Sequence, residues 1–174
     1  MTRAALFIAA AAGALAISAP AQAAAGPTDP QIAHIAYTAG TIDVEAGKQA
    51  LKMSHNATVR EFAQQMVRDH QAVNAKALAL VKKLKVTPEA NATSASLTKA
   101  ADAESAKLSK LKGADFDREY MRNEVAFHKT VNGALASTLI PSAHNAELKS
   151  LLETGLTLFK EHQAHAEQVA AKLK

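Results

Sequence analysis

The feature that most constrains this fold is a helical spacing of apolar residues that recurs in four long segments. Apolar residues return every three or four positions from Ile32 to Met53, which places them on one face of a helix. The same spacing runs from Val59 to Leu84, from Phe116 to Leu139 and from Leu148 to Leu173. Aromatic residues make up only 4% of the chain, and strands favour aromatic and β-branched residues. The sequence therefore predicts an all-α protein.

Capping residues, prolines and a glycine mark the ends of these helices. The first helix is expected to begin at a cap and first-turn pair, and the others to start or stop at similar signals. These boundary residues are Asp29 and Pro30 for the first helix, Asn56 with Thr87 and Pro88 for the second, Asp115 and Pro141 for the third, and Asn145 for the last.

The connection between the second and third long helices is much longer than the other two. It holds a weaker helix with a thin apolar stripe from Leu97 to Leu111, which is expected to end at Gly113. Such a link can run the length of a bundle and leave the helices on either side of it parallel. We therefore expect a ferritin-like antiparallel bundle of four long helices with a short crossover helix. A five-helix up-and-down bundle is the alternative.

The first 23 residues have the pattern of a secretory signal peptide. Arg3 precedes an apolar run from Ala4 to Ile17, and the small residues Ala21 and Ala23 suit cleavage after Ala23. A membrane anchor is the alternative, but the run is shorter than the roughly 20 residues that span a bilayer. We expect export to the periplasm, with residues 24–174 forming a single helical-bundle domain.

The chain has no cysteine, so disulfides, thiolate metal ligands and a lipid-modified cysteine are excluded. Acidic and basic residues alternate on the expected helix surfaces, and aromatic residues are few, which argues against nucleic-acid binding. Gly-rich phosphate loops, a nucleophile elbow and zinc-protease motifs are missing from the sequence. An enzyme of the common hydrolytic kinds is not expected, and neither is stable membrane insertion of the mature chain.

Five polar residues fall on the inward faces of the long helices, each near the middle of its helix. His70 lies on the second helix, Glu124 and His128 on the third, His162 on the fourth, and Asp43 near the edge of the apolar face of the first. In an antiparallel bundle, residues at mid-height share one layer whichever way each helix points. The sequence therefore predicts a polar layer in an apolar core.

Two interpretations of this layer stay open. The five residues either form a hydrogen-bonded network that fixes helix register, or they bind a divalent transition metal, as imidazoles and carboxylates do in metal-binding bundles. Met66, one turn before His70, is a further candidate ligand for copper or a core residue, and His165 is a candidate extra ligand. His34, His55, His144 and His165 are expected at the surface.

Several motifs resemble one known family. They are the segment Thr41–Gly47, the run Ala57–His70, the pair Phe116 and Asp117 with Tyr120 and His128, and His162. In this order they resemble the exported bacterial family called domain of unknown function 4142, often labelled predicted outer membrane protein. The resemblance covers essentially the whole mature chain and implies a ferritin-like fold and an envelope location, with outer-membrane association as a possibility. It implies no activity.

The sequence differs from the di-iron ferritin pattern at three places. Val67, Val125 and Phe159 stand three residues before His70, His128 and His162, where that pattern has glutamate. A single-metal or metal-free layer is therefore expected in place of a di-iron oxidase. The functional prediction is a non-catalytic periplasmic binding or envelope-stress module whose partner is unidentified, with an envelope protein as the candidate. A metal-binding protein with the five layer residues as ligands is the alternative.

Overall fold

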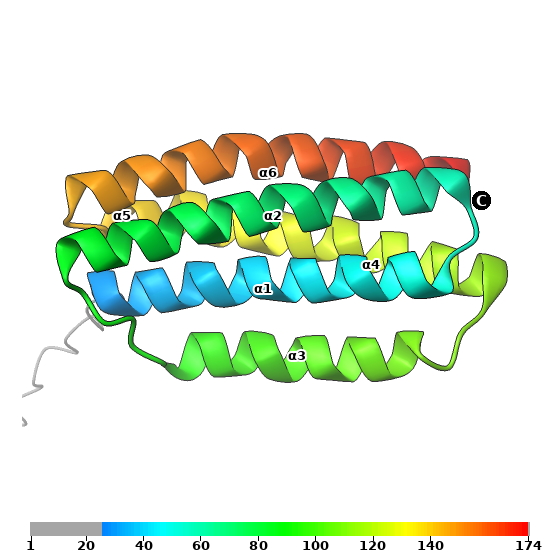
Figure 1. Cartoon of the computed structure of the whole chain (residues 1–174), viewed down its shortest axis with the longest axis horizontal. Helices are drawn as coiled ribbons and strands as arrows, with labels where there is room; N and C mark the ends of the chain where they lie inside the picture. Colours follow the sequence, from blue (N-terminus) through cyan, green and yellow to red (C-terminus); the bar gives the residue numbers. More distant parts are fainter. Residues whose placement is uncertain (1–25, 174) are drawn as a thin grey trace, which may run out of the picture.

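Helices form where the apolar spacing predicts them. The structure is a computed structural model that describes residues 26–173, and these residues contain helices and no strand (Figure 1). The predicted signal peptide, residues 1–23, lies outside the described residues. The elements are α1 Asp29–Met53, α2 Ala57–Leu84, α3 Ala92–Leu108, α4 Gly113–Ala134, the π-helical turn η1 Leu135–Leu139, α5 Ile140–Ser142 and α6 Ala146–Lys172.

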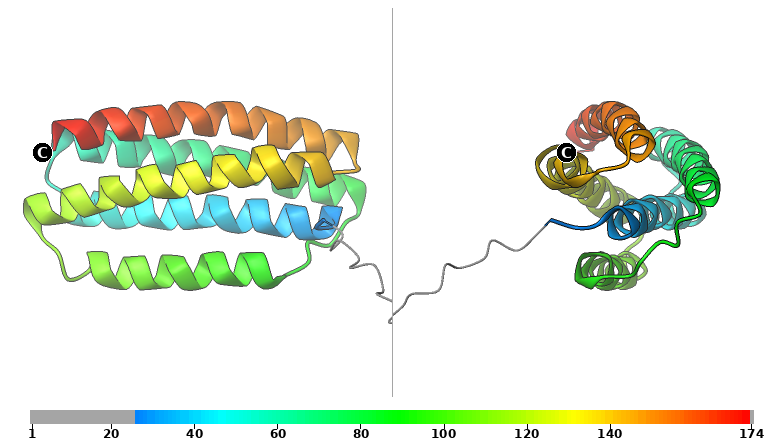
Figure 2. Two further views of the ribbon diagram at one scale, coloured as in Figure 1. Left: turned by 180° about the vertical axis from the view of Figure 1, so that it is seen from behind. Right: turned by 90° about the vertical axis from the view of Figure 1, so that its left-hand side faces the viewer.

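The four long helices α1, α2, α4 and α6 surround one core, and α3 lies outside them. Figure 1 shows α2 running back along α1, and α3 then returning along the outer side of α1, so that α2 and α4 point the same way. The end-on view in Figure 2 shows the four-helix arrangement with α3 on its margin. The predicted ferritin-like bundle with a crossover helix is confirmed, and the five-helix up-and-down alternative is wrong.

The start of α1 differs from the expected cap. Thr28 is the N-cap, and its backbone N–H donates to Oε1 of Gln31 at 3.2 Å. The carboxylate of Asp29, the predicted cap, instead accepts hydrogen bonds from the backbone N–H groups of His144 and Asn145 at 2.9 and 2.8 Å. Asp29 therefore ties the start of α1 to the start of α6.

Two other boundaries also differ from the prediction. Gly113 has a φ of +53°, a value that glycine adopts readily, but it begins α4, because α3 has already ended at Leu108. Pro141 does not close the third long helix at once. It lies in α5, directly after η1, so the helical path continues to Ser142.

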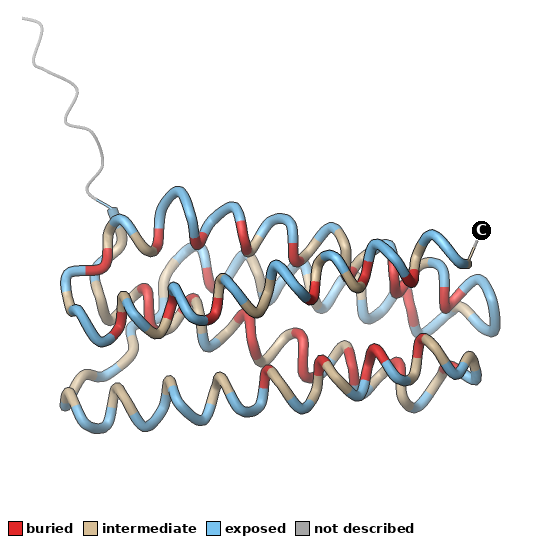
Figure 3. The backbone as a smooth tube through the Cα atoms, turned by 90° about the horizontal axis from the view of Figure 1, so that it is seen from above, coloured by how far each residue is buried: buried red, intermediate tan, exposed pale blue. Residues whose placement is uncertain are grey.

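Apolar side chains form two core clusters, one on each side of the polar layer. The cluster toward the α1–α2 turn contains Ala50, Val59, Phe62, Ala63, Met66, Leu108, Phe116, Tyr120, Met121, Ala166 and Val169. The cluster toward the α6 start contains Ile32, Ile35, Leu135, Leu139, Ala143, Leu148 and Leu152. Figure 3 shows the buried residues distributed along the long helices. In α2, however, the last buried residue is His70.

Among the described helices, none combines the length and the hydropathy that crossing a bilayer requires.

Candidate metal centre

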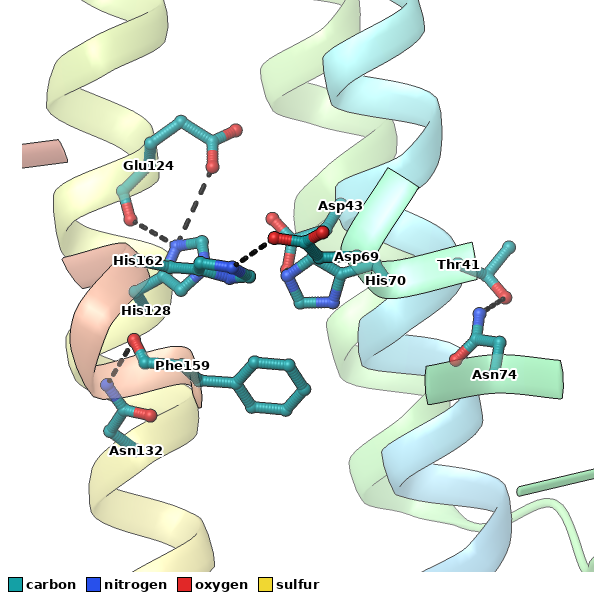
Figure 4. Close-up of polar contacts among 10 residues, drawn as sticks. All are labelled: Thr41, Asp43, Asp69, His70, Asn74, Glu124, His128, Asn132, Phe159 and His162. Carbon is teal, nitrogen blue, oxygen red and sulfur yellow. Dashed lines mark hydrogen bonds and ion pairs between the residues drawn. The ribbon is translucent and has the colours of Figure 1, made fainter. Parts of the chain in front are cut away.

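The structure brings the five predicted layer residues together inside the bundle. Asp43 comes from α1, His70 from α2, Glu124 and His128 from α4, and His162 from α6, and none is more than 3% exposed. All four long helices therefore contribute to the layer. Figure 4 shows the imidazoles and carboxyl groups facing one another between the helices.

The layer contains two overlapping groups of potential metal ligands. Nitrogens of His70, His128 and His162 lie within 4.8 Å of one another, and so do ligand atoms of Asp43, Glu124 and His128. The ring centroids of the three imidazoles are 5.2 to 5.7 Å apart. His128 belongs to both groups, so the two groups are adjacent.

Hydrogen bonds orient two of the three imidazoles. Nδ1 of His128 lies 3.0 Å from the backbone carbonyl oxygen of Glu124, and because a carbonyl only accepts, Nδ1 carries the proton. Nε2 of His162 lies 3.1 Å from Oδ2 of Asp69, so Nε2 carries the proton there. The other nitrogens, Nε2 of His128 and Nδ1 of His162, are buried and have no partner among the described residues. Each keeps a free lone pair.

His70 is held mainly by packing. Its ring stacks on Phe159 with centroids 4.7 Å apart and an interplanar angle of 13°. Its Nε2 lies 3.4 Å from Oδ2 of Asp43, and neither ring nitrogen makes a hydrogen bond within the described part of the chain. A carboxylate or carbonyl next to each imidazole is the arrangement that orients histidine ligands of metals.

Burial keeps the three imidazoles neutral. It lowers the pKa of His70 to about 4, against a smaller opposing effect of Asp69. Burial also lowers the pKa of His162 to about 4, with a further contribution from the charge of His70, and it lowers the pKa of His128. Neutral imidazole is the form that binds a metal ion.

Burial has the opposite effect on the two carboxyl groups. It raises the pKa of Asp43 to about 6, although the charge of His128 opposes this. Burial and then the charge of Asp43 raise the pKa of Glu124 well above its ordinary value. The pair therefore retains a proton at a pH where exposed carboxyl groups have lost theirs, and a bound cation would reverse this preference.

Other sequence candidates lie outside the cluster. Met66 is buried in the apolar cluster on the α1–α2 side of the layer. His165 makes a 2.9 Å hydrogen bond with Gln65 and packs edge-on against Phe62. His144 is exposed, and its backbone bonds to Asp29.

The sequence analysis missed two residues that shape the site. Asp69 orients His162, and Phe159 stacks on His70. Asp69 lies beside the apolar stripe of α2 and stays 19% exposed, so it looks like a surface carboxylate. Its position immediately before His70 is the one signal that could have pointed to it.

A comparison with protein families matches residues 14–169 to the family described as "Domain of unknown function (DUF4142)". No curated protein matches the chain. Among solved structures, the chain is similar to one described as a secreted DUF305 protein from Streptomyces coelicolor, with a TM-score of 0.69 and 12% sequence identity. The match covers 82% of this chain and 91% of the other. At this identity the similarity shows the fold alone.

Proposed function

The chain belongs to the DUF4142 family, and we propose that this member is an exported helical bundle that binds one divalent transition-metal ion in its polar layer. The proposed ligands are the grouped imidazoles of His70, His128 and His162, and the proposed fourth ligand is a carboxylate oxygen of Asp43, which lies 3.4 Å from Nε2 of His70, or of Glu124, which groups with Asp43 and His128. The proposed role is binding, without a catalytic step.

The observation that carries the proposal is the set of unpaired nitrogens. His70, His128 and His162 are each at least 99% buried, and each offers a ring nitrogen that has no hydrogen-bond partner among residues 26–173. Leaving a buried polar atom unpaired costs about 1 to 3 kcal/mol. Three such residues in one buried layer favour an occupant that accepts lone pairs, and a metal cation does so.

The geometry needs only a small adjustment to hold an ion. A tetrahedral ion with bonds of about 2.1 Å keeps its donor atoms about 3.4 Å apart, and nitrogens of the three imidazoles lie within 4.8 Å of one another. Side-chain rotations at the centre of a bundle can close this difference. Neutral imidazoles with one carboxylate suit zinc, copper, iron or nickel better than calcium or magnesium.

Export is the second part of the proposal. The support is the signal-peptide pattern of residues 1–23, together with the description of the structural neighbour from Streptomyces coelicolor as a secreted protein. Mass spectrometry of the protein from the periplasmic fraction tests it. The proposal requires a mature chain that begins near Ala24, and a chain that keeps its first 23 residues in the membrane fraction contradicts it.

Metal analysis of protein purified without an affinity tag tests the binding site. The expected result is about one metal ion per chain, or tight uptake of one added Zn²⁺ or Co²⁺ by the apoprotein. Bound Co²⁺ should give the intense visible absorption of a four-coordinate site. His70→Ala and His128→Ala should lose the ion, and His144→Ala, a change at an exposed histidine, should keep it.

A second candidate function is favoured by the contacts that the layer does make. Asp43 lies 3.4 Å from His70, and Asp69 lies 3.1 Å from His162, which suits a structural network in a bundle that acts through its surface. In that case the apoprotein takes up no Zn²⁺, Co²⁺ or Cu²⁺, and its melting temperature does not change when these ions are added.

A further inference from the structure

The bundle is packed unevenly on the two sides of its polar layer. On the side of the α1–α2 turn, α2 buries Val59, Phe62 and Met66 completely. Beyond His70 the same helix continues to Leu84 without another buried residue. The inward-facing side chains in this second half of α2 are therefore less tightly packed than side chains in a protein core normally are.

A cavity of about 530 Å³ occupies this half of the molecule. Its walls come from α1, α2, the start of α3, α4, η1 and α6, so it lies between the helices of the bundle, and it opens to solvent where exposed residues such as Thr93 and Thr138 line it. On α6 the wall runs from Leu148 to Phe159, about 16 Å along the helix axis. The cavity is therefore elongated along the bundle, and its volume lies in the range of small-molecule sites.

Small residues create the space. Ala39 and Ala77 line it from two helices, where a four-helix bundle ordinarily places larger side chains that fill the centre. One wall is the turn η1, Leu135–Leu139. Single π-helical turns inside α-helices occur frequently at functional sites.

The two ends of the cavity differ. Phe159 lines the end at the polar layer, and there its ring stacks on His70. At the other end Gln31, Asn91 and Thr93 supply amide and hydroxyl groups. No charged side chain is among the described residues that line the cavity.

We propose that this cavity binds one linear apolar molecule with an uncharged polar end, such as a long-chain alcohol or a monoacylglycerol. The hydrocarbon chain lies along the bundle axis between α2 and η1, and the hydroxyl end meets the amides at Gln31 and Asn91. The inference does not depend on the metal site, because the cavity residues and the ligand residues are different sets.

The chemistry of the walls decides the class of ligand. Part of the apolar surface of α2 and α6 is left uncovered by other helices. Covering it with a hydrocarbon chain lowers the free energy. A carboxylate or phosphate end group would find no cation to pair with, because the described residues that line the cavity are uncharged. A linear shape follows from the length of the wall relative to its volume.

A tryptophan reporter tests the proposal directly, because the chain contains no tryptophan. Leu80 lines the cavity, and Leu78 on the same helix is 48% exposed. Leu80→Trp should show a saturable blue shift of its emission when dodecan-1-ol is added, and Leu78→Trp should show none. No shift at Leu80→Trp, or equal shifts in both variants, would overturn the proposal.

A second measurement uses the uncharged dye N-phenyl-1-naphthylamine with the otherwise unchanged protein, in the presence of EDTA so that metal is excluded. The dye should bind with a stoichiometry of one and be displaced by dodecan-1-ol at least tenfold more effectively than by dodecanoate. Displacement by dodecanoate alone contradicts the uncharged end group.

Filling the cavity should abolish dye binding. Ala77→Phe places a ring in the space, and Ala79→Phe makes the same change on the exposed side of α2. We expect at least a tenfold loss of affinity in the first variant and none in the second. Circular dichroism checks folding, and Ala39→Phe, at a buried lining position of α1, repeats the test should Ala77→Phe not fold. Undiminished binding in a folded cavity-filling variant would overturn the proposal.

Discussion

Nε2 of His162 lies 3.1 Å from Oδ2 of Asp69, across the interface between α6 and α2. His162 is fully buried, and Asp69 lies at the boundary between the core and solvent. Because the carboxylate accepts the proton of Nε2, it fixes the ring tautomer and leaves the free lone pair on Nδ1, which is buried. Asp69 is thus a positioning residue: it acts on the proposed ion through His162.

Replacing Asp69 should weaken metal binding without removing a ligand. Asp69→Asn keeps the size of the side chain, but its amide can present either NH₂ or oxygen to His162, so the tautomer is no longer fixed. Loss of such an outer partner typically costs 10- to 100-fold in metal affinity. Competition titration of Zn²⁺ against a chromophoric chelator measures it. Asp102→Asn, at an exposed position, is the control, and equal affinities for both variants would contradict this role.

The carboxyl pair should control how metal binding depends on pH. Burial raises the pKa of Asp43 to about 6 and that of Glu124 further, whereas the pKa values of His70 and His162 are lowered to about 4. Between pH 7 and pH 5 the imidazoles therefore stay neutral, while protons compete with the ion for the carboxyl pair. Affinity should fall as pH falls through this window, by up to about tenfold per pH unit for each proton released.

Calorimetry in two buffers with different ionisation enthalpies counts that proton. At pH 7 the wild type should release close to one proton per ion, and Glu124→Gln should release fewer and bind with a flatter pH dependence from pH 7 to pH 5. A dependence that steepens only below pH 5, with no proton released at pH 7, would show that the imidazoles and not the carboxyl pair are being titrated.

The fold and the layer were predictable because both depend on periodicity. A spacing of three or four residues places His70 and His128 on the inward faces of their helices whatever the tertiary details. The long link before Asp115 required either a crossover or a fifth core helix, and the thin stripe of α3 correctly favoured the crossover. Whether the layer binds metal stays a prediction.

The parts that could not be predicted depend on contacts between helices. Val73, Ala77 and Val81 continue the apolar stripe of α2 with the same spacing as Val59 and Phe62, yet they line a cavity while the other two are fully buried. Periodicity says which face points inward but not whether the neighbouring helices reach it. Asp29 was likewise predicted to cap its own helix, because the sequence does not show that the start of α6 lies within hydrogen-bonding distance.

Asp29 should contribute to stability as a bridge between helices. Its carboxylate accepts two backbone hydrogen bonds at the start of α6, where the helix dipole also favours a negative charge. Asp29→Ala should lower the free energy of unfolding by about 1 to 2 kcal/mol, measured by urea denaturation. Asp102→Ala, at an exposed position of α3, should change it by less than about 0.5 kcal/mol. Equal losses of unfolding free energy in the two variants would mean that the hydrogen bonds of Asp29 to the start of α6 add no stability beyond that of any surface carboxylate.

The uneven packing of α2 predicts different costs for one substitution at two of its valines. Val59 is fully buried, and Val81 lines the cavity. Val59→Ala removes methyl groups from a filled core and should cost about 2 kcal/mol of unfolding free energy, whereas Val81→Ala should cost about 0.5 kcal/mol or less, because its methyl groups have few contacts to lose. Saturating dodecan-1-ol should increase only the second cost, since a bound chain would contact Val81. A cost at Val81 that equals that at Val59 before any ligand is added would mean that the protein in solution closes this space by itself.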